Sequence, residues 1–320
     1  MDILIDSQKN GKTIKALLRE EMGYSSGMLK KLKFSPGGIL VNGEFKTVRY
    51  ELREGDILSI ACEDKDEDVS PYIIPSDISI GIAYEDSFVT VVDKPSNMPA
   101  HPSHGHRLDT VANALAFRYN NEPYVFRPVN RLDRDTSGLM ITANNRLSAF
   151  KLYKSMINGK IKKLYIAVLD GHPENDEGCI KTYVCRCEDS IVKRRVCKAE
   201  DADAKEAVTL YKTICKNDRY TVVVASPITG RTHQLRLHFS HIGCPITGDT
   251  MYGNESTVIS RHALHAFYLS FPHPETNNTV SCTADLPEDM RALIDDTEYE
   301  TVKNIIDNGA ENILDYDKTQ

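Results

Sequence analysis

The stretch RPVNRLDRDTSGLMITA occupies residues 127–143 and decides how the rest of the chain is interpreted. Two carboxylates and two arginines lie in the five residues from Arg131 to Asp135. The Thr-Ser-Gly triplet at residues 136–138 accepts turn geometry, and the apolar run at residues 139–141 predicts a short buried strand. A charged loop that enters a buried strand can hold a reactive group at the floor of a cleft. The alternative is a surface loop with local ion pairs.

Length and hydropathy limit the class of protein. At 320 residues the chain is long enough for a sizeable core and about two domains. No apolar run is as long as the roughly 18 residues that a membrane-spanning helix needs. The first residues, MDILID, lack the basic and apolar regions of a signal peptide. We expect a cytoplasmic protein without a membrane partner, and we take it to be a monomer.

The net charge of −7 is unusual for a protein that binds nucleic acid, but it is unevenly distributed. Residues 283–320 contain eleven acidic and three basic side chains, so this segment carries −8 and the rest of the chain about +1. The acidity therefore belongs to a C-terminal tail, which we predict to be helical over residues 291–320. Basic clusters elsewhere can still contact phosphates. The strongest comprises Lys193, Arg194, Arg195 and Lys198.

The eight cysteines are scattered along the chain, which favours reduced cytosolic thiols over a disulfide framework. Cys185 and Cys187, with Cys179 and Cys197, could indicate a zinc site. Their spacing lacks the paired two-residue gaps of common zinc sites. Alternating strand positions are the favoured interpretation, and no metal is expected.

Residues 1–62 have the pattern of a small separate domain. The apolar spacing of residues 14–18 predicts one helix, which Gly23 would end. A second helix, capped by Ser25 or Ser26, would carry three basic side chains, Lys30, Lys31 and Lys33. The alternative is a helix-hairpin module with a solvated basic face.

Two strands and a linker complete this first part of the chain. Residues 39–43 read ILVNG and predict a strand that enters an Asn-Gly turn. Residues 49–60 predict another strand, interrupted at Gly55-Asp56. The charged run EDKDED follows, so we interpret residues 63–79 as a flexible linker.

The elements around the central stretch alternate between strand and helix patterns. Residues 88–95, FVTVVDKP, predict a buried strand that ends at a Lys-Pro turn. Asp109 is placed to cap a helix over residues 110–119, and residues 147–156 also have helical spacing. Between them lie His101, His104 and His106, whose irregular spacing favours a polar, substrate-facing loop over a metal site.

The central stretch resembles the signature of the RluA-type pseudouridine synthases, which reads His-Arg-Leu-Asp, two variable residues, Thr-Ser-Gly. Residues 130–138 read NRLDRDTSG, so Asn130 stands where the family has His. The resemblance implies that Asp133 is the nucleophile. For Asp135, a local ion pair with Arg131 or Arg134 is the better interpretation. If the family's His is structural, Asn130 changes little; if that His contacts RNA, Asn130 would alter substrate preference.

Further signatures follow in order downstream. The strand that begins at Lys162 resembles the family's Lys-x-Tyr strand, with the tyrosine at Tyr165. Residues 230–238, GRTHQLRLH, are similar to the family's Gly-Arg-Thr-His-Gln-Ile-Arg-x-His, and CPITGD at residues 244–249 continues the pattern. The resemblance covers residues 80–290. It implies an α+β pseudouridine synthase fold, with a mixed, mostly antiparallel sheet flanked by helices and loops.

The resemblance also implies roles for individual side chains. Arg236 would hold the Asp133 carboxylate ionised, for which a guanidinium suits better than an ammonium. The target uridine must leave its stack at a cost of about a few kcal/mol. Arg131 would fill the vacated place. Tyr165 would lie against the extruded base with its hydroxyl placed for proton transfer, although β-propensity alone could explain a tyrosine on a strand.

Residues 1–62 resemble a small α/β RNA-binding domain named after a small-subunit ribosomal protein. The resemblance implies phosphate contacts from Lys30, Lys31 and Lys33. We also assign Arg231 and His233 to RNA binding.

The predicted function is the isomerisation of specific uridines in structured RNA, most readily large-subunit ribosomal RNA, without a cofactor. The alternatives are a tRNA pseudouridine synthase and a catalytically silent RNA-binding protein of the same fold. A magnesium-dependent phosphatase with an Asp-x-Asp-x-Thr loop is excluded by spacing, because Thr136 directly follows Asp135.

Overall fold

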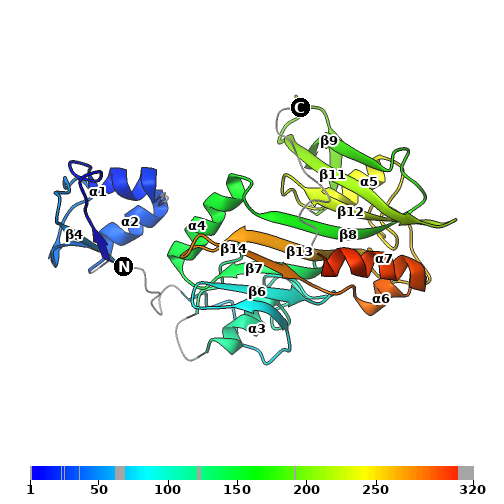
Figure 1. The fold of residues 1–320 in the computed structure, drawn as a ribbon, viewed down its shortest axis with the longest axis horizontal. Helices are drawn as coiled ribbons and strands as arrows, with labels where there is room; N and C mark the ends of the chain where they lie inside the picture. The colour runs from blue at the N-terminus through cyan, green and yellow to red at the C-terminus, as the bar shows by residue number, and fades with distance from the viewer. Residues whose placement is uncertain are drawn as a thin grey trace.

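The computed structural model describes residues 2–308, apart from positions 23, 25, 36, 62–68, 121–123 and 191. The described residues form two separate sheets (Figure 1). The smaller sheet has the order β1-β4-β2-β3 and belongs to the N-terminal part of the chain. The larger one has ten strands and fills the rest of the molecule.

The N-terminal unit packs its helices on the small antiparallel sheet. Its strands are β1 (Asp2–Leu4), β2 (Ile39–Val41), β3 (Glu44–Phe45) and β4 (Ile57–Ile60), and its helices are α1 (Ile14–Ala16), the π-helical turn η1 (Leu17–Glu21) and α2 (Ser26–Phe34). The predicted apolar face is confirmed, because Ile14, Leu17 and Leu18 are buried in one cluster with strands β2 and β4. The predicted helix end at Gly23 and the cap at Ser25 lie outside the described residues.

The strand predictions for this unit are confirmed in part. Strand β2 ends in the expected Asn42-Gly43 turn, where both residues have positive φ, as a two-residue hairpin requires. The long strand predicted over residues 49–60 is wrong in its first half. Glu51 makes only an isolated bridge to Thr13, and regular pairing begins at Ile57, after the turn at Gly55.

The large sheet has the order β10-β9-β11-β12-β8-β13-β7-β6-β5, with β14 on β13. Among the described residues, every strand pair of this sheet is antiparallel except β13 with β7, which confirms the predicted mixed, mostly antiparallel sheet. Its strands are β5 (Gly81–Glu85), β6 (Val89–Lys94), β7 (Ser137–Ala143), β8 (Lys162–Asp170), β9 (Glu177–Arg186), β10 (Arg194–Cys197), β11 (Lys205–Lys216), β12 (Tyr220–Pro227), β13 (Leu264–Pro272) and β14 (Thr279–Thr283).

Helices lie against this sheet and between its strands in the chain (Figure 1). They are α3 (Val111–Arg118), α4 (Arg146–Ile157), α5 (Gln234–His241), α6 (Glu288–Arg291) and α7 (Asp296–Asp307). Helix α5 packs on β10, β11 and β12, and α7 packs on β11. Helix α7 covers part of the predicted helical tail, and it buries Val302 and Ile306 against the main core. Residues 309–320 of that prediction lie outside the described residues. None of the described helices combines the length and apolar character that a membrane crossing requires.

The cap predicted for α3 is wrong by one residue. Thr110, not Asp109, is the N-cap, and it forms a capping box with Asn113. Asp109 instead contacts the His106 ring, with Nδ1 2.6 Å from the carboxylate. Thr110 could be either the N-cap or the first helical residue, as judged from the sequence. The side chain of Asn113, three residues further on, makes it the N-cap.

Strand β7 begins at Ser137, two residues earlier than the apolar run suggests, because it pairs with β13 there. Gly138 has φ of 105° and lies opposite Ala266, and a Cβ at this position would come 2.2 Å from the Ala266 carbonyl oxygen. The glycine therefore allows the parallel contact between β13 and β7, directly after the charged loop.

We expect Gly138→Ala to lower the free energy of unfolding by more than about 2 kcal/mol, through both the clash and the positive φ. Gly171→Ala is the matched control, because its φ is 83° and no atom lies within 4 Å of its would-be Cβ. Denaturant unfolding of both variants checks this. Equal losses at the two positions would mean that close packing against Ala266 contributes nothing.

Candidate active site

The charged loop of the central stretch carries Asp133 at the entrance to β7. The Thr136 amide donates to the Asp133 carbonyl at 3.2 Å, which closes a turn. The Asp133 side chain is 28% exposed, whereas every residue of β7 is buried. The carboxylate is therefore open to a substrate while its backbone is anchored in the core.

Three buried side chains from other elements hold this loop. Lys94 Nζ, at the end of β6, donates to the Arg134 carbonyl at 2.9 Å. Arg261 donates to the Asp135 carbonyl at 3.1 Å, and His262 Nε2 lies 2.7 Å from the Thr136 hydroxyl. Consecutive loop residues are thus fixed one by one, so the position of the carboxylate is set before any substrate binds.

The Lys94 ammonium depends on backbone carbonyls for its partners. It also donates to the carbonyls of Pro95 at 2.8 Å and Met98 at 2.9 Å. Burial lowers its pKa to about 7, against the opposing charges of Asp135 and Asp133. Its role in the site is to bind the loop.

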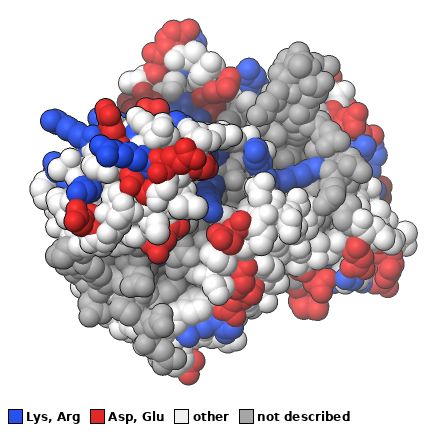
Figure 2. All heavy atoms as spheres, turned by 60° about the vertical axis from the view of Figure 1, so that its left-hand side comes forward, with Lys and Arg blue, Asp and Glu red and all other residues white. Residues whose placement is uncertain are grey.

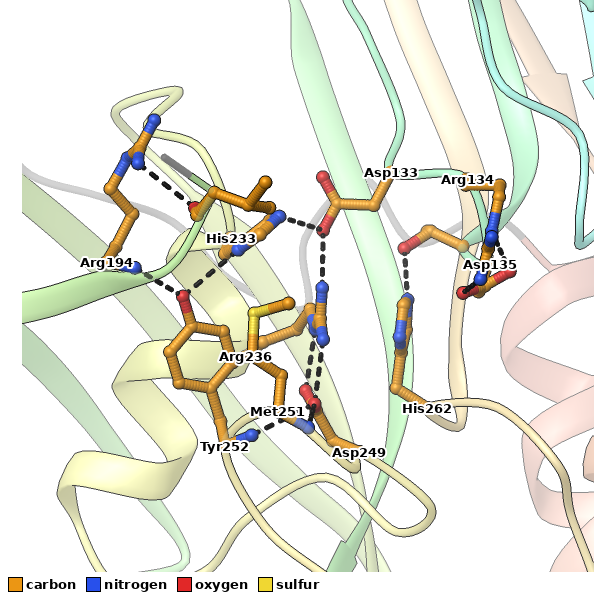
Figure 3. Close-up of polar contacts among 12 residues, drawn as sticks. Asp133, Arg134, Asp135, Arg194, His233, Arg236, Asp249, Met251, Tyr252 and His262 are labelled. Atoms are coloured by element: carbon orange, nitrogen blue, oxygen red, sulfur yellow. Dashed lines mark hydrogen bonds and ion pairs between the residues drawn. The ribbon is translucent and has the colours of Figure 1, made fainter. Parts of the chain in front are cut away.

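Arg236, from helix α5, is the cation beside Asp133. Its Nη1 lies 3.3 Å from Asp133 Oδ2, and its side chain is 9% exposed (Figure 3). On its other side Nε and Nη2 bind the two oxygens of Asp249 at 2.6 and 2.7 Å. The bidentate pair fixes the guanidinium plane and leaves one edge aimed at Asp133.

Asp249 is a buried carboxylate that orients Arg236. Burial alone would raise the pKa of Asp249, but the hydrogen bonds and charge of Arg236 outweigh burial, and the pKa is lowered. The amides of Met251 and Tyr252 also donate to Asp249 Oδ1, at 3.0 and 3.2 Å. The carboxylate is therefore ionised and fully partnered inside the protein.

His233 and Tyr252 form the wall next to this ion pair (Figure 3). The Tyr252 hydroxyl accepts from the Arg194 amide at 2.8 Å and lies 3.0 Å from His233 Nδ1. The hydroxyl can donate its proton to Nδ1, and in that tautomer the ring proton lies on Nε2, 3.9 Å from Asp133 Oδ2. Burial lowers the pKa of His233 against the charge of Asp133, which favours the neutral ring.

The sequence folds this way around α5 because Gln234 anchors the turn that precedes the helix. Its side-chain oxygen accepts from the Arg231 amide and the Thr229 hydroxyl, and its nitrogen donates to the Val208 carbonyl. His233 then adopts a left-handed conformation with φ of 57°. The turn sends Arg236 inward and His233 toward the loop of Asp133.

Tyr165 lies in the same row of the large sheet as the start of β7. Tyr165 pairs with Ala266 of β13, which pairs with Gly138 of β7, so two strand spacings, or roughly 10 Å, separate their backbones. Burial, followed by the Asp133 charge, raises the pKa of Tyr165. Its phenol is therefore neutral, and it stands close enough to Asp133 to sense that charge.

Two expectations about the loop itself are answered by the structure. Asp135 forms the predicted local ion pair with Arg134, with two contacts of 2.9 Å. Asn130 is buried, and its Oδ1 accepts from the Ile141 amide at 2.8 Å. The side chain that replaces the family's His thus holds β7 and does not face solvent.

The other residues predicted to contact RNA are not part of the buried contacts around Arg236. Arg131 is exposed beside Asp133, whereas Arg231 is exposed and donates from Nε to the Glu206 carbonyl at 2.8 Å. Lys30 and Lys33 are exposed on α2 of the N-terminal unit, and the side chain of Lys31 is outside the described residues.

The histidines of the loop before α3 do not gather as metal ligands. His106 contacts Asp109, and His101 packs edge-on against Phe126 with ring centroids 4.7 Å apart. Among the described residues, the one group with ligand atoms close enough for a metal ion is Cys185, Cys197 and Asp201, and it includes none of these histidines.

The surface charge is mixed. Figure 2 shows lysine and arginine side chains next to acidic ones across one face of the molecule, without a single sign covering it. Phosphate contacts on this face would therefore come from local groups of basic side chains, as the near-neutral charge of residues 1–282 suggests.

Sequence reasoning missed four side chains that build the site: Lys94, Asp249, Arg261 and His262. Lys94 and Asp249 lie inside segments that resemble the family, but their partners are not visible in the sequence. A signal was present at Asp249 and Lys94, because each is a charged residue adjoining an apolar segment, where an unpaired charge is costly.

The chain is similar to known proteins of one family. The family described as RNA pseudouridylate synthase matches residues 89–241. YjbO of Bacillus subtilis, an uncharacterized RNA pseudouridine synthase, is 38% identical over 276 residues, which cover 86% of this chain and 95% of YjbO. The ribosomal large subunit pseudouridine synthase D of Buchnera aphidicola subsp. Schizaphis graminum is 32% identical over 300 residues, covering 85% of this chain and 90% of that protein.

The fold also matches a solved structure. Human RNA pseudouridylate synthase domain containing 1 aligns with a TM-score of 0.55 and 29% identity, over 66% of this chain and 85% of that one. The matched region of the family, residues 89–241, contains Asp133, Tyr165 and Arg236.

Proposed function

The chain belongs to the RNA pseudouridylate synthase family, and we propose that it converts specific uridines of large-subunit ribosomal RNA to pseudouridine, with Asp133 as the nucleophile. The observation that carries the proposal is the placement of Asp133. Its carboxylate is part-exposed, on a loop fixed at three consecutive residues, and 3.3 Å from a buried arginine. Such a carboxylate is fixed in position, lies beside a cation and is accessible, as a nucleophile must be.

The reaction breaks the bond between N1 and C1′ of uridine and joins C5 to C1′. No atom is gained or lost, since the proton that leaves C5 is balanced by one at N1. We propose that Tyr165 lies against the extruded base and that its neutral phenol exchanges a proton there. Arg131, exposed next to Asp133, is proposed to occupy the place that the uridine leaves.

Ribosomal RNA is favoured over tRNA by the names of relatives at similar identity. The Buchnera protein and that of Zymomonas mobilis, 34% identical over 234 residues, are both named ribosomal large subunit pseudouridine synthase D. A purified enzyme offered equal amounts of a large-subunit rRNA transcript and a mixed tRNA pool is expected to form pseudouridine in the rRNA. Pseudouridine formed only in tRNA would contradict the proposed rRNA substrate and favour a tRNA pseudouridine synthase.

We propose the same division of labour that the sequence suggests. Residues 1–62 would bind RNA, residues 63–79 would link, residues 80–290 would carry the chemistry, and residues 291–320 would form the acidic tail. The small unit contacts the rest through Tyr24, whose ring stacks on Phe150 of α4 with centroids 6.3 Å apart. We propose that the enzyme acts as a cytoplasmic monomer.

Basic side chains on α2 give this division a test. The double variant Lys30→Ala/Lys33→Ala is expected to weaken binding to the natural RNA and to reduce the slope of log affinity against log salt by roughly one to two, since each lost phosphate contact changes the slope by about 0.7–0.9. Fluorescence anisotropy at several salt concentrations measures both.

Lys46→Ala is the matched control in the same unit, because Lys46 is engaged with Glu44 at 2.8 Å. Turnover at saturating RNA is expected to stay within about twofold of wild type in both variants. An unchanged salt slope in the double variant would remove α2 from the RNA interface, and a lost turnover at saturation would place the unit in the active site.

A further inference from the structure

Two cysteines and an aspartate meet outside the active site, at the edge of the large sheet. Cys185 lies on β9, Cys197 on β10, and Asp201 in the loop that leads to β11. One ligand atom of each lies within 4.8 Å of the others. These are donors that divalent zinc-like ions prefer. The reaction proposed above uses none of them.

The strand register brings the two thiols together. Arg195 is opposite Cys185 in the β9–β10 pair, and Cys197 is two residues further on. Cys185 and Cys197 are therefore diagonal neighbours whose side chains project from the same face of the hairpin. They converge even though they are twelve positions apart in the chain.

The third donor comes from a loop that crosses this face. Strands β10 and β11 lie on opposite sides of β9, so residues 198–204 must pass over the end of β9 to join them. Cys185 lies close to the C-terminal end of β9, and its side chain is 5% exposed. The loop is fixed in place by Asp201 itself, which accepts from the Lys198 amide and from Arg195, both at 3.3 Å.

A disulfide does not suit this arrangement. Diagonal positions on neighbouring strands have Cα atoms about 7–8 Å apart, beyond the range that a disulfide spans without backbone movement. A metal ion can join two thiols whose sulfur atoms are further apart than in a disulfide. Two thiolates at about 2.3 Å from a tetrahedral zinc lie roughly 3.8 Å from each other, and the ligand atoms here lie within 4.8 Å.

We propose that Cys185, Cys197 and Asp201 bind a zinc-type divalent ion, with the two thiolates and one carboxylate oxygen as ligands and water in a fourth position. Each thiol loses its proton to solvent when the ion binds. The hydrogen bonds from Arg195 and from the Lys198 amide both end on Oδ2 of Asp201, so we assign Oδ1 as the oxygen that binds the ion.

The charges around the site balance when the ion is bound. Two thiolates and one carboxylate carry −3, the ion reduces this to −1, and the Arg195 guanidinium beside Asp201 neutralises the remainder. Proton release accompanies binding, because a cysteine binds the ion as a thiolate.

The ion would fasten the loop of residues 198–204 to the β9–β10 hairpin. That hairpin carries Arg194, whose amide donates to Tyr252 in the wall of the active site at 2.8 Å. The site is thus structural, and it stiffens the basic hairpin that contacts Tyr252. It does not depend on which RNA the enzyme modifies.

Cobalt is the probe that tests this, since Co²⁺ bound by thiolates has an intense near-ultraviolet charge-transfer band. We expect reduced, full-length protein to develop this band up to one equivalent of Co²⁺ and to lose it on addition of Zn²⁺. Cys185→Ser and Cys197→Ser are expected to weaken binding at least about tenfold and to reduce the band. Cys179→Ser, on the exposed part of β9, is the control and should behave as wild type.

Asp201→Asn is the second variant, because it keeps both thiols and can still accept the turn's hydrogen bonds. We expect it to retain the charge-transfer band at about tenfold or more weaker affinity, with a wild-type circular dichroism spectrum. The absence of the band in reduced wild-type protein would overturn the proposal. So would a band that persists in both cysteine variants, or a Cys185–Cys197 disulfide in protein whose reduced form binds no cobalt.

Discussion

Asp133→Asn is expected to reduce pseudouridine formation by more than about 10³-fold while leaving RNA affinity within about twofold of wild type. Asparagine has the same shape and can still contact Arg236, but it cannot act as an anionic nucleophile. The side chain is 28% exposed and joins Arg236 through one contact of 3.3 Å, so its loss costs about 1 kcal/mol of stability or less. Release of tritium from RNA labelled at C5 of uridine measures turnover directly.

Asp135→Asn is the matched control, two residues away on the same loop. Its carboxylate pairs with Arg134 at 2.9 Å, and only its carbonyl is held by Arg261. We expect its activity to stay within about tenfold of wild type. Substantial turnover by Asp133→Asn, or an equal loss in Asp135→Asn, would show that the wrong carboxylate has been assigned.

Arg236→Ala is expected to lower kcat by roughly 10²–10³-fold, because removal of a preorganised charge from an enclosed site has effects of this size. The variant also leaves Asp249 buried without its cation, which costs about 3–5 kcal/mol of stability. The kcat of Arg236→Ala should therefore be measured on protein that circular dichroism shows to be folded. A second variant is needed to separate the loss of stability from the loss of catalysis.

The double variant Arg236→Ala/Asp249→Ala separates the two effects. It removes the stranded charge, so we expect much of the stability to return while kcat stays low. Arg231→Lys is the surface control and should keep kcat within a few-fold of wild type, since Arg231 is exposed and contacts a backbone carbonyl. Wild-type kcat in Arg236→Ala, or its recovery in the double variant, would remove Arg236 from the catalytic site.

The part of the site that the sequence predicts is the part encoded locally. The loop of Asp133 and the apolar strand after it are contiguous, and Arg236 lies on a short helix at a fixed distance from His233. Periodicity and turn residues report on such segments because they describe how one stretch meets solvent and core. The same signals located Tyr165 on a strand of the main sheet.

What the sequence does not reveal is pairing across long separations. Lys94 meets the Arg134 carbonyl 40 residues away, and Arg261 meets that of Asp135 126 residues away. Asp249 looks like a residue of a polar turn until Arg236 is placed beside it. Cys197 and Asp201 likewise become partners of Cys185 only through the register of β9 with β10.

Errors at element ends have the same origin. Asp109 and Thr110 are both good helix caps, and only the side chain of Asn113 decides between them. Strand pairing begins at Ile57 and not at residue 49, because its partner Asn42 is placed there by the Asn-Gly turn. Each choice depends on a neighbour that propensity does not describe.

The most direct test of the account is a map of pseudouridine in the RNA of cells that lack this protein, carrying either an empty vector, the wild-type gene or the Asp133→Asn variant. We expect defined positions in large-subunit ribosomal RNA to be uridine without the protein and pseudouridine with the wild type. With Asp133→Asn, expressed at the same level, they should remain uridine. Restoration of those positions by Asp133→Asn, or a map that is identical with and without the protein, would contradict the assignment of this site as the one that isomerises uridine.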